Sequence, residues 1–261
     1  MESETGIRLG FFFGMLAIMA IWEVVTPRRR QQASKPKRWA ANLGIVVVNT
    51  VLLRLLIPAG AMGAAAFAEA EGWGVLHMIG LPVPFAIVAA VVLLDCAIYW
   101  QHVIFHAVPM LWRLHKVHHA DVEIDVSTGL RFHPVEILLS MVIKMVVVVL
   151  LGAPVLAVLI FEVLLNATAM FNHGNVWLPP EVDRWLRLII VTPDMHRVHH
   201  SIIRQETDSN FGFNLSLWDR MFGSYRDQPE AGHIGMQIGL PEYRQARGLS
   251  WMLALPFRPR G

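Results

Sequence analysis

Histidines recur in short boxes along the middle of the chain, and imidazole is a strong ligand for iron and zinc. The stretch from Asp95 to His119 ends in the box Arg-Leu-His-Lys-Val-His-His. Nearly the same box, Asp-Met-His-Arg-Val-His-His, returns at residues 194–200. The eight candidate ligands in the three boxes are His102, His106, His115, His118, His119, His196, His199 and His200.

The spacing of these histidines suits metal ligation from helices. Residues four apart share one face of a helix, and this spacing separates the first and last histidine of each box. A single histidine is more often a satisfied polar residue at a helix end. Eight without a metal would repel one another when protonated or lose solvation near an apolar region. Since one ion rarely takes more than four protein ligands, the number of histidines predicts two metals.

Other polar residues lie near the boxes and admit two interpretations. His173, in Phe-Asn-His-Gly-Asn, is a candidate ninth ligand, and His133 is either a ligand or an outer group. Ligating histidines usually have an outer hydrogen-bond partner. The candidates for that role are Asp95, Tyr99, Asn172, Asp208 and Asn210. The alternative for this set is ordinary helix packing, or folding of the segment that follows the last box.

Several familiar metal and redox sites do not match the sequence. The histidine boxes contain no Glu-x-x-His pair of soluble di-iron bundles and no His-Glu-x-x-His of zinc proteases. Cys96 is the one cysteine, so it forms neither an internal disulfide nor an iron–sulfur cluster. We therefore expect an all-histidine dinuclear site whose electrons come from a separate protein.

The elements that must position this site are apolar. The chain has 261 residues, 55% hydrophobic and 16% charged, and its mean hydropathy of +0.48 indicates an integral membrane protein. Apolar segments are expected at Phe11–Val25, Leu43–Ala68 and Pro82–Phe105, followed by a hairpin at 135–171 broken by Gly-Ala-Pro. The pattern predicts an all-α membrane bundle of about four spanning helices or equivalents, including the hairpin, with a histidine-rich metal-binding cap.

Charge gives the expected orientation. Of the 22 Lys and Arg residues, all but Arg8, Arg54 and Lys144 fall in segments on one side of the bundle, which the positive-inside rule places in the cytosol. The histidine boxes lie on the same side. The net charge of +2 gives no indication of nucleic-acid binding. We expect three regions: membrane helices with a basic connection at 1–81, a catalytic region at 82–225, and a tail with an interfacial helix at 226–261.

The ordered motifs HVIFH, HKVHH, RFHPVE, NHGNV, TPDMHRVHHS and SNFGFNLSLWDRMFGSY resemble the fatty acid hydroxylase/sterol desaturase superfamily from about Asp95 to Tyr225. The resemblance implies a non-haem di-iron centre held by the eight box histidines, with His173 as an extra ligand; zinc can replace iron in a purified sample. It also implies O2, a membrane lipid substrate and an external cytochrome-b5-like or ferredoxin-like electron donor. Some relatives carry a further histidine where this chain has Ala169, which implies less complete coordination of one metal.

Two alternatives remain at this stage. One is a membrane metal-binding or metal-transport protein without oxygenase activity, and the other is a bis-histidine haem protein. Within the superfamily, hydroxylation is favoured over desaturation because hydroxylating relatives are common, and no residue decides between them. Sterol, carotenoid, fatty acyl and ether lipid substrates all suit an apolar channel.

Overall fold

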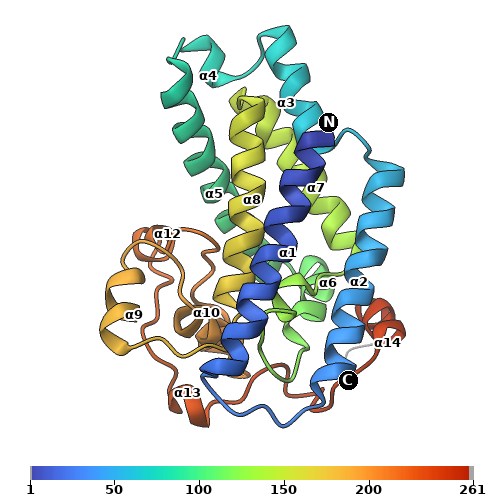
Figure 1. The fold of residues 1–261 in the computed structure, drawn as a ribbon, viewed down its shortest axis with the longest axis vertical. Coiled ribbons are helices and arrows are strands. Elements are labelled where there is room, and N and C mark those ends of the chain that lie inside the picture. Colours follow the sequence, from blue (N-terminus) through green and yellow to red (C-terminus); the bar gives the residue numbers. More distant parts are fainter. Residues whose placement is uncertain (1, 259–261) are drawn as a thin grey trace.

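The protein is all-helical, as the sequence predicted. The computed structural model describes residues 2–258, in which the regular elements are helices accompanied by a few isolated β-bridges (Figure 1). The longer helices are α1 (Glu2–Val25), α2 (Lys35–Leu56), α3 (Gly60–Glu71), α5 (Val83–Ala107), α6 (Pro109–His119), α7 (Pro134–Leu151) and α8 (Val155–Asn172). The shorter ones are α4 (Val75–Met78), α9 (Pro180–Leu186), α10 (Pro193–His199), α11 (Arg204–Thr207), α12 (Leu217–Met221), α13 (Gly232–Gly235) and α14 (Leu249–Ala254), with 3-10 turns at Thr128–Leu130 and Leu255–Phe257.

Five helical segments of the described chain are long and apolar enough to cross a membrane. They are Glu4–Val25, Lys35–Met78, Val83–Ala107, Pro134–Leu151 and Val155–Asn172. The last two are the arms of the predicted hairpin, each long enough to count separately. Five candidate spans and a histidine-rich end confirm the predicted helical membrane bundle.

The predicted segment Leu43–Ala68 is not one continuous helix. It is divided between α2 and α3 at Ile57–Ala59, where Ile57 leaves the helical conformation with φ −135° and ψ 61°. Proline disfavours helical backbone at the residue before it, so Pro58 accounts for the break. The chain then resumes as α3 and turns through α4 at the end of the bundle far from the cap (Figure 1).

The hairpin turn lies at that same far end. Gly152 ends α7 with φ 65°, a left-handed cap that favours glycine, and Pro154 precedes α8. A β-carbon on Gly74 would lie 2.0 Å from the backbone nitrogen of Gly152, so the two glycines allow close contact between the turn and the segment before α4. Both arms consequently return to the end of the bundle that carries the cap.

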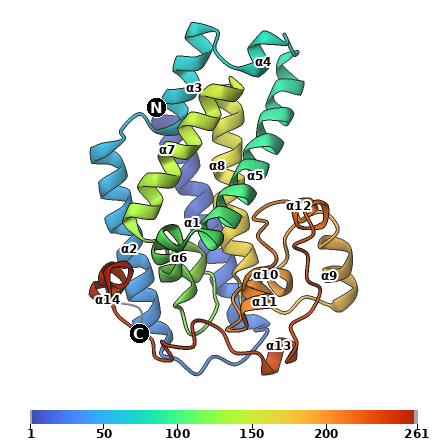
Figure 2. The same cartoon turned by 180° about the vertical axis from the view of Figure 1, so that it is seen from behind.

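Residues after α8 build a cap around the ends of α5 and α8, while α14 packs on α2 (Figures 1 and 2). Buried Asp95 on α5 attaches this cap to the membrane helix. Its Oδ2 accepts hydrogen bonds from the backbone N–H of Leu215 at 3.1 Å and from the indole N–H of Trp218 at 2.8 Å. Tyr99, one turn further along α5, packs with Phe211 and Trp218.

A buried ionic network attaches α2 to the loop that follows α6. Arg38 donates from Nε and Nη2 to the carboxylate of Asp121 at 2.6 and 2.9 Å, and from Nη1 to Asp125 at 2.6 Å. Burial would raise the pKa of Asp121, but the Arg38 guanidinium outweighs that effect and lowers it. Asp121 is therefore charged, and Arg38 is the cation that both carboxylates contact.

Replacing Arg38 with methionine is expected to destabilise the protein by about 3–5 kcal/mol, because two buried carboxylates lose their partner. Thermal unfolding of the purified protein in detergent measures the effect. Lys37→Met, which removes an exposed cation from the same helix, is the matched control and should change little. Equal unfolding midpoints for the two variants would contradict this account of the network.

Candidate metal centre

Nine buried histidines converge at the cap end of the bundle in two adjoining clusters. Within each cluster, every histidine offers one ring nitrogen within 4.8 Å of the others. The first cluster, hereafter the five-histidine cluster, contains His102, His106, His115, His119 and His199. The second, hereafter the four-histidine cluster, contains His118, His173, His196 and His200. The structure thus brings together the eight box histidines and the predicted ninth, His173.

Helices α6 and α10 each contribute histidines to both clusters. His115 and His119, four residues apart on α6, face the five-histidine cluster, whereas His118 faces the other. On α10 and its C-terminal cap the division is reversed, since His196 and His200 face the four-histidine cluster and His199 the five-histidine cluster. The two clusters therefore adjoin, because α6 and α10 each supply histidines to both of them.

The distances between ring nitrogens fit shared metal ions. His118 Nε2 and His196 Nε2 lie 3.1 and 3.0 Å from His173 Nε2, and His102 Nε2 lies 3.1 Å from His115 Nε2. Two nitrogens bonded at right angles to one ion, each about 2.1 Å from it, are separated by about 3 Å. The separations within both clusters thus match what ligation by a common ion requires.

Several imidazole nitrogens have no other partner among the described residues. Neither ring nitrogen of His119 or His200 has a hydrogen-bond partner, although both side chains are fully buried. The Nε2 atoms of His106 and His199 are likewise unpaired. Buried polar atoms without partners cost free energy, and a metal ion bound among them would remove that cost. The donor set therefore fits resident metals.

Backbone carbonyls fix the orientation of four of the rings. The Nδ1–H groups of His102, His173 and His199 each donate at 2.7 Å, to the carbonyls of Phe211, Ala169 and Ser209 respectively. His118 Nδ1–H donates to the carbonyl of Arg131 at 3.3 Å. Since a carbonyl only accepts, Nδ1 carries the proton and the lone pair of Nε2 points into the cluster.

Carboxylates hold two further rings of the five-histidine cluster. His115 Nδ1–H donates to Oε1 of Glu136 at 2.6 Å, and His106 Nδ1–H donates to Oδ1 of Asp208 at 3.2 Å. Asp208 lies where an outer partner was predicted. Glu136 was visible in the motif RFHPVE but was not among the predicted site residues. The signal that could have found it is a lone acid in the first turn of an apolar helix, two residues after a His-Pro pair.

Burial keeps the histidines outside the membrane-spanning segments neutral. It lowers the pKa of His115 to about 3 and that of His173 to about 4. Burial, followed by the neighbouring imidazoles, lowers the pKa well below 6.5 for His118, His119, His196, His199 and His200. At neutral pH these rings therefore have lone pairs free for a metal.

The other five predicted site residues form no side-chain hydrogen bond with a histidine of either cluster in the part of the chain that the structure describes. His133 is the N-cap of α7, where Nδ1 accepts from Val135 N–H at 3.2 Å and Nε2–H donates to the Leu253 carbonyl at 3.2 Å. Asn172 donates to the carbonyl of Phe213 at 3.0 Å. Asn210 donates to the carbonyls of Met195 and Arg226. The hydroxyls of Tyr99 and Ser224 are hydrogen-bonded at 2.8 Å, and Asp95 holds the cap as described above.

Asn172 and Asn210 anchor the segment 210–214, whose Phe211 carbonyl accepts from His102. Asp219, in the stretch that follows the last box, holds this segment most directly. Its carboxylate accepts from the backbone N–H of Phe211 at 2.7 Å and of Gly212 at 2.9 Å. The carbonyl of Phe211 accepts the hydrogen bond from His102, so Asp219 orients a candidate ligand through one intervening residue.

A bundle of membrane-length helices with two buried all-histidine clusters at one end defines a multi-pass membrane protein with histidine boxes arranged to bind metal. The fatty acid hydroxylase family model matches residues 87–224, more than half of the chain. The chain therefore belongs to the fatty acid hydroxylase family, which confirms the resemblance seen in its motifs.

Curated relatives include enzymes of lipid oxidation. Ornithine lipid hydroxylase OlsE of Rhizobium tropici is 31% identical over 180 residues, 69% of this chain and 53% of that protein. Human alkylglycerol monooxygenase is 28% identical over 171 residues, 63% of this chain and 36% of that protein. Delta(7)-sterol 5(6)-desaturase of Candida dubliniensis is 29% identical over 133 residues, 51% and 32% respectively. The chain thus spans about half or less of these relatives' lengths, and no solved structure matches it.

Proposed function

We propose that this protein is an oxygen-dependent, non-haem di-iron hydroxylase of a membrane lipid, with residues 82–225 as its catalytic region. The proposal rests on one observation: two buried all-histidine clusters adjoin at one end of membrane-length helices. A transporter would need ligands at successive depths along its path. Both ligand clusters found in residues 2–258 lie together at one end, which favours the enzyme over the metal-transport alternative.

Two iron ions, one in each cluster, would supply oxygen activation strong enough to attack an unactivated lipid C–H bond. The chain's own residues orient the ligands and exclude water. Phe132 stacks on His118 with ring centroids 4.4 Å apart, and Trp112 covers His106 at 4.9 Å. Electrons must be delivered by a separate partner of the cytochrome-b5 or ferredoxin type, because the sequence carries no second redox motif.

The curated relatives favour hydroxylation over desaturation. The names ornithine lipid hydroxylase and alkylglycerol monooxygenase both describe the addition of oxygen. The sterol relative is a desaturase and matches a shorter part of the chain. The two outcomes differ in how the substrate carbon is placed relative to the metals, which depends on small displacements. The histidine geometry by itself suits either reaction.

The decisive experiment supplies membranes containing the protein with 18O2, a reductase system and a lipid extract, and identifies products by mass. We expect one lipid class to gain a single labelled oxygen atom. A His115→Ala variant, which lacks a candidate ligand, should form at least about a thousandfold less product. Loss of two hydrogens without label would assign a desaturase instead. No product above the variant's level with any lipid or reductant would leave the metal-binding alternative ahead.

We further propose that the metal centre lies on the cytosolic side, in line with the distribution of basic residues. In a Cys96→Ser background, single cysteines at Met78 and Gln228 test this orientation. Both positions are exposed, Met78 on α4 at one end of the bundle and Gln228 in the cap at the other (Figure 1). In intact cells an impermeant thiol reagent should label the cysteine at 78 and not the one at 228. The opposite result would place the centre outside.

A further inference from the structure

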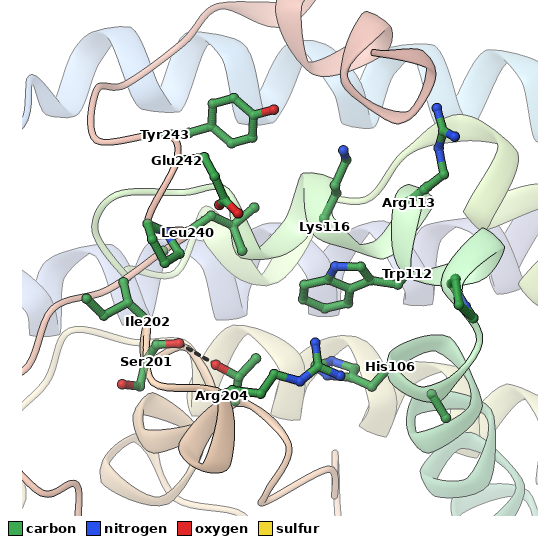
Figure 3. A pocket seen from close by; sticks show the side chains of 15 residues that line it. His106, Trp112, Arg113, Lys116, Ser201, Ile202, Arg204, Leu240, Glu242 and Tyr243 are labelled. Carbon is green, nitrogen blue, oxygen red and sulfur yellow. Dashed lines mark hydrogen bonds between the residues drawn. The ribbon is translucent and has the colours of Figure 1, made fainter. Parts of the chain in front are cut away.

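A pocket of about 530 Å³ opens beside the five-histidine cluster, and no step of the proposed chemistry yet uses it (Figure 3). Its walls come from α6, from the segment after α10, and from the loop at 239–243. His106, a member of the cluster, lines it. Trp112 also lines it, with its ring 4.9 Å from that of His106 and 5.3 Å from that of His119.

Cations predominate among the charged residues that line the pocket. Arg113, Lys116 and Arg204 line it, and Glu242 is the acid among the lining residues. Arg204 pairs with Asp208, the acid that also holds His106, and its guanidinium lies over the Trp112 ring at 5.6 Å. When Asp208 and Glu242 are included, cations outnumber acids among these described side chains.

Arg113 is held by two backbone carbonyls and forms no ion pair within residues 2–258. Its Nε donates to the carbonyl of Pro256 at 2.6 Å, and its Nη2 donates to the carbonyl of Arg258 at 3.2 Å. Carbonyls orient a guanidinium but do not neutralise it. A guanidinium held in this way is suited to an anion, because its planar donors match the oxygens of phosphate or carboxylate.

We propose that this pocket binds the anionic phosphate or carboxylate headgroup of the lipid substrate. The inference rests on the proposed function, of which it specifies the substrate class. A volume of about 530 Å³ is typical of a small-molecule site and accommodates a headgroup with its adjoining carbons, but not an entire two-chain lipid. Because His106 both lines the pocket and belongs to the five-histidine cluster, a headgroup bound here places the carbons next to it close to that cluster.

Binding of short-chain lipids tests the proposal independently of catalysis. The probes are dihexanoyl phosphatidic acid and dihexanoylglycerol, titrated calorimetrically into the full-length protein in a neutral detergent. Inorganic phosphate is titrated separately to distinguish a lipid headgroup from a free anion. We expect the phosphatidic acid to bind at least about tenfold more tightly than the neutral lipid, and more weakly at high salt.

Charge variants then locate the binding site. Arg113→Gln should weaken phosphatidic acid binding about tenfold, while Glu242→Gln, which removes the opposing acid, should strengthen it. A variant that merely misfolds cannot produce the second result. Arg247→Gln removes an exposed cation outside the pocket and should leave binding unchanged. The binding measurement does not need turnover, so it remains valid even if the oxygenase assay finds no product.

Three results would overturn the proposal. The first is equal affinity for the anionic and the neutral lipid. The second is binding of inorganic phosphate as tight as that of phosphatidic acid, which would reassign the pocket to a free anion. The third is an increased KM for the reductant in the Arg113 variant with unchanged lipid binding, which would make this face a docking site for an acidic redox protein.

Discussion

Replacing His119 with alanine is expected to remove the metal of the five-histidine cluster and leave the other metal bound, so that content falls from about two ions per chain to about one. His200→Ala should do the converse, since His200 belongs to the four-histidine cluster. The loss should be more complete for His200, whose cluster retains three ligands instead of four. Elemental analysis of the purified variants measures both effects, and product formation should fall at least about a thousandfold in each.

The control for this pair is His77→Ala, because His77 lies near the hairpin turn at the far end of the bundle and belongs to neither cluster. Its metal content should equal that of the wild-type protein. The double variant His119→Ala/His200→Ala should retain little metal. Full metal content in the double variant would show that the histidine clusters are not the metal site.

Removing the carboxylate of Glu136 is expected to weaken the five-histidine site without removing any ligand. Glu136→Ala leaves the Nδ1–H of His115 without its acceptor, so the ring loses its fixed orientation. Loss of such an outer partner typically lowers metal affinity or activity about 10–100-fold, and we expect a loss in this range here. Glu136→Gln keeps an oxygen acceptor and should have a smaller effect. Competition with a chelator measures the affinity of each variant.

Glu162 provides the matched control for this prediction. It is also a buried acid of the hairpin, but it pairs with Lys144 at 2.9 Å and Arg8 at 2.6 Å instead of a histidine. Glu162→Ala should lower the unfolding midpoint and leave the affinity of the folded protein for metal unchanged. If Glu136→Ala behaves in the same way as Glu162→Ala, Glu136 is a packing residue and does not act on the metal site.

The sequence predicted the fold and the grouping of the histidines because both depend on local periodicity. Runs of apolar residues identify membrane-length helices, and a spacing of four places His115 and His119 on one helix face. His173 was predicted as a further ligand from its motif alone. The proline break inside the second apolar segment was missed because high hydropathy on both sides of Pro58 concealed a change in backbone direction.

The partners that orient the rings were harder to predict, because most of them are not side chains. The carbonyls of Phe211 and Ser209 reach His102 and His199 only after the segment beyond α11 folds against α5 and α10. Any residue type can supply a carbonyl, so no sequence pattern indicates it. Likewise, the sorting of histidines between two clusters depends on how α6 and α10 face each other, which is a tertiary property.

The division of ligands between α6 and α10 has a consequence for biosynthesis. Each cluster takes at least one ligand from the segment that ends at His200, so neither ligand set is complete until that segment has left the ribosome. By then all five candidate spans have been synthesised, and only the residues after His200 remain. Both ligand sets are therefore completed only after the hairpin has been synthesised, and a nascent chain stalled before α10 lacks at least one histidine of each cluster.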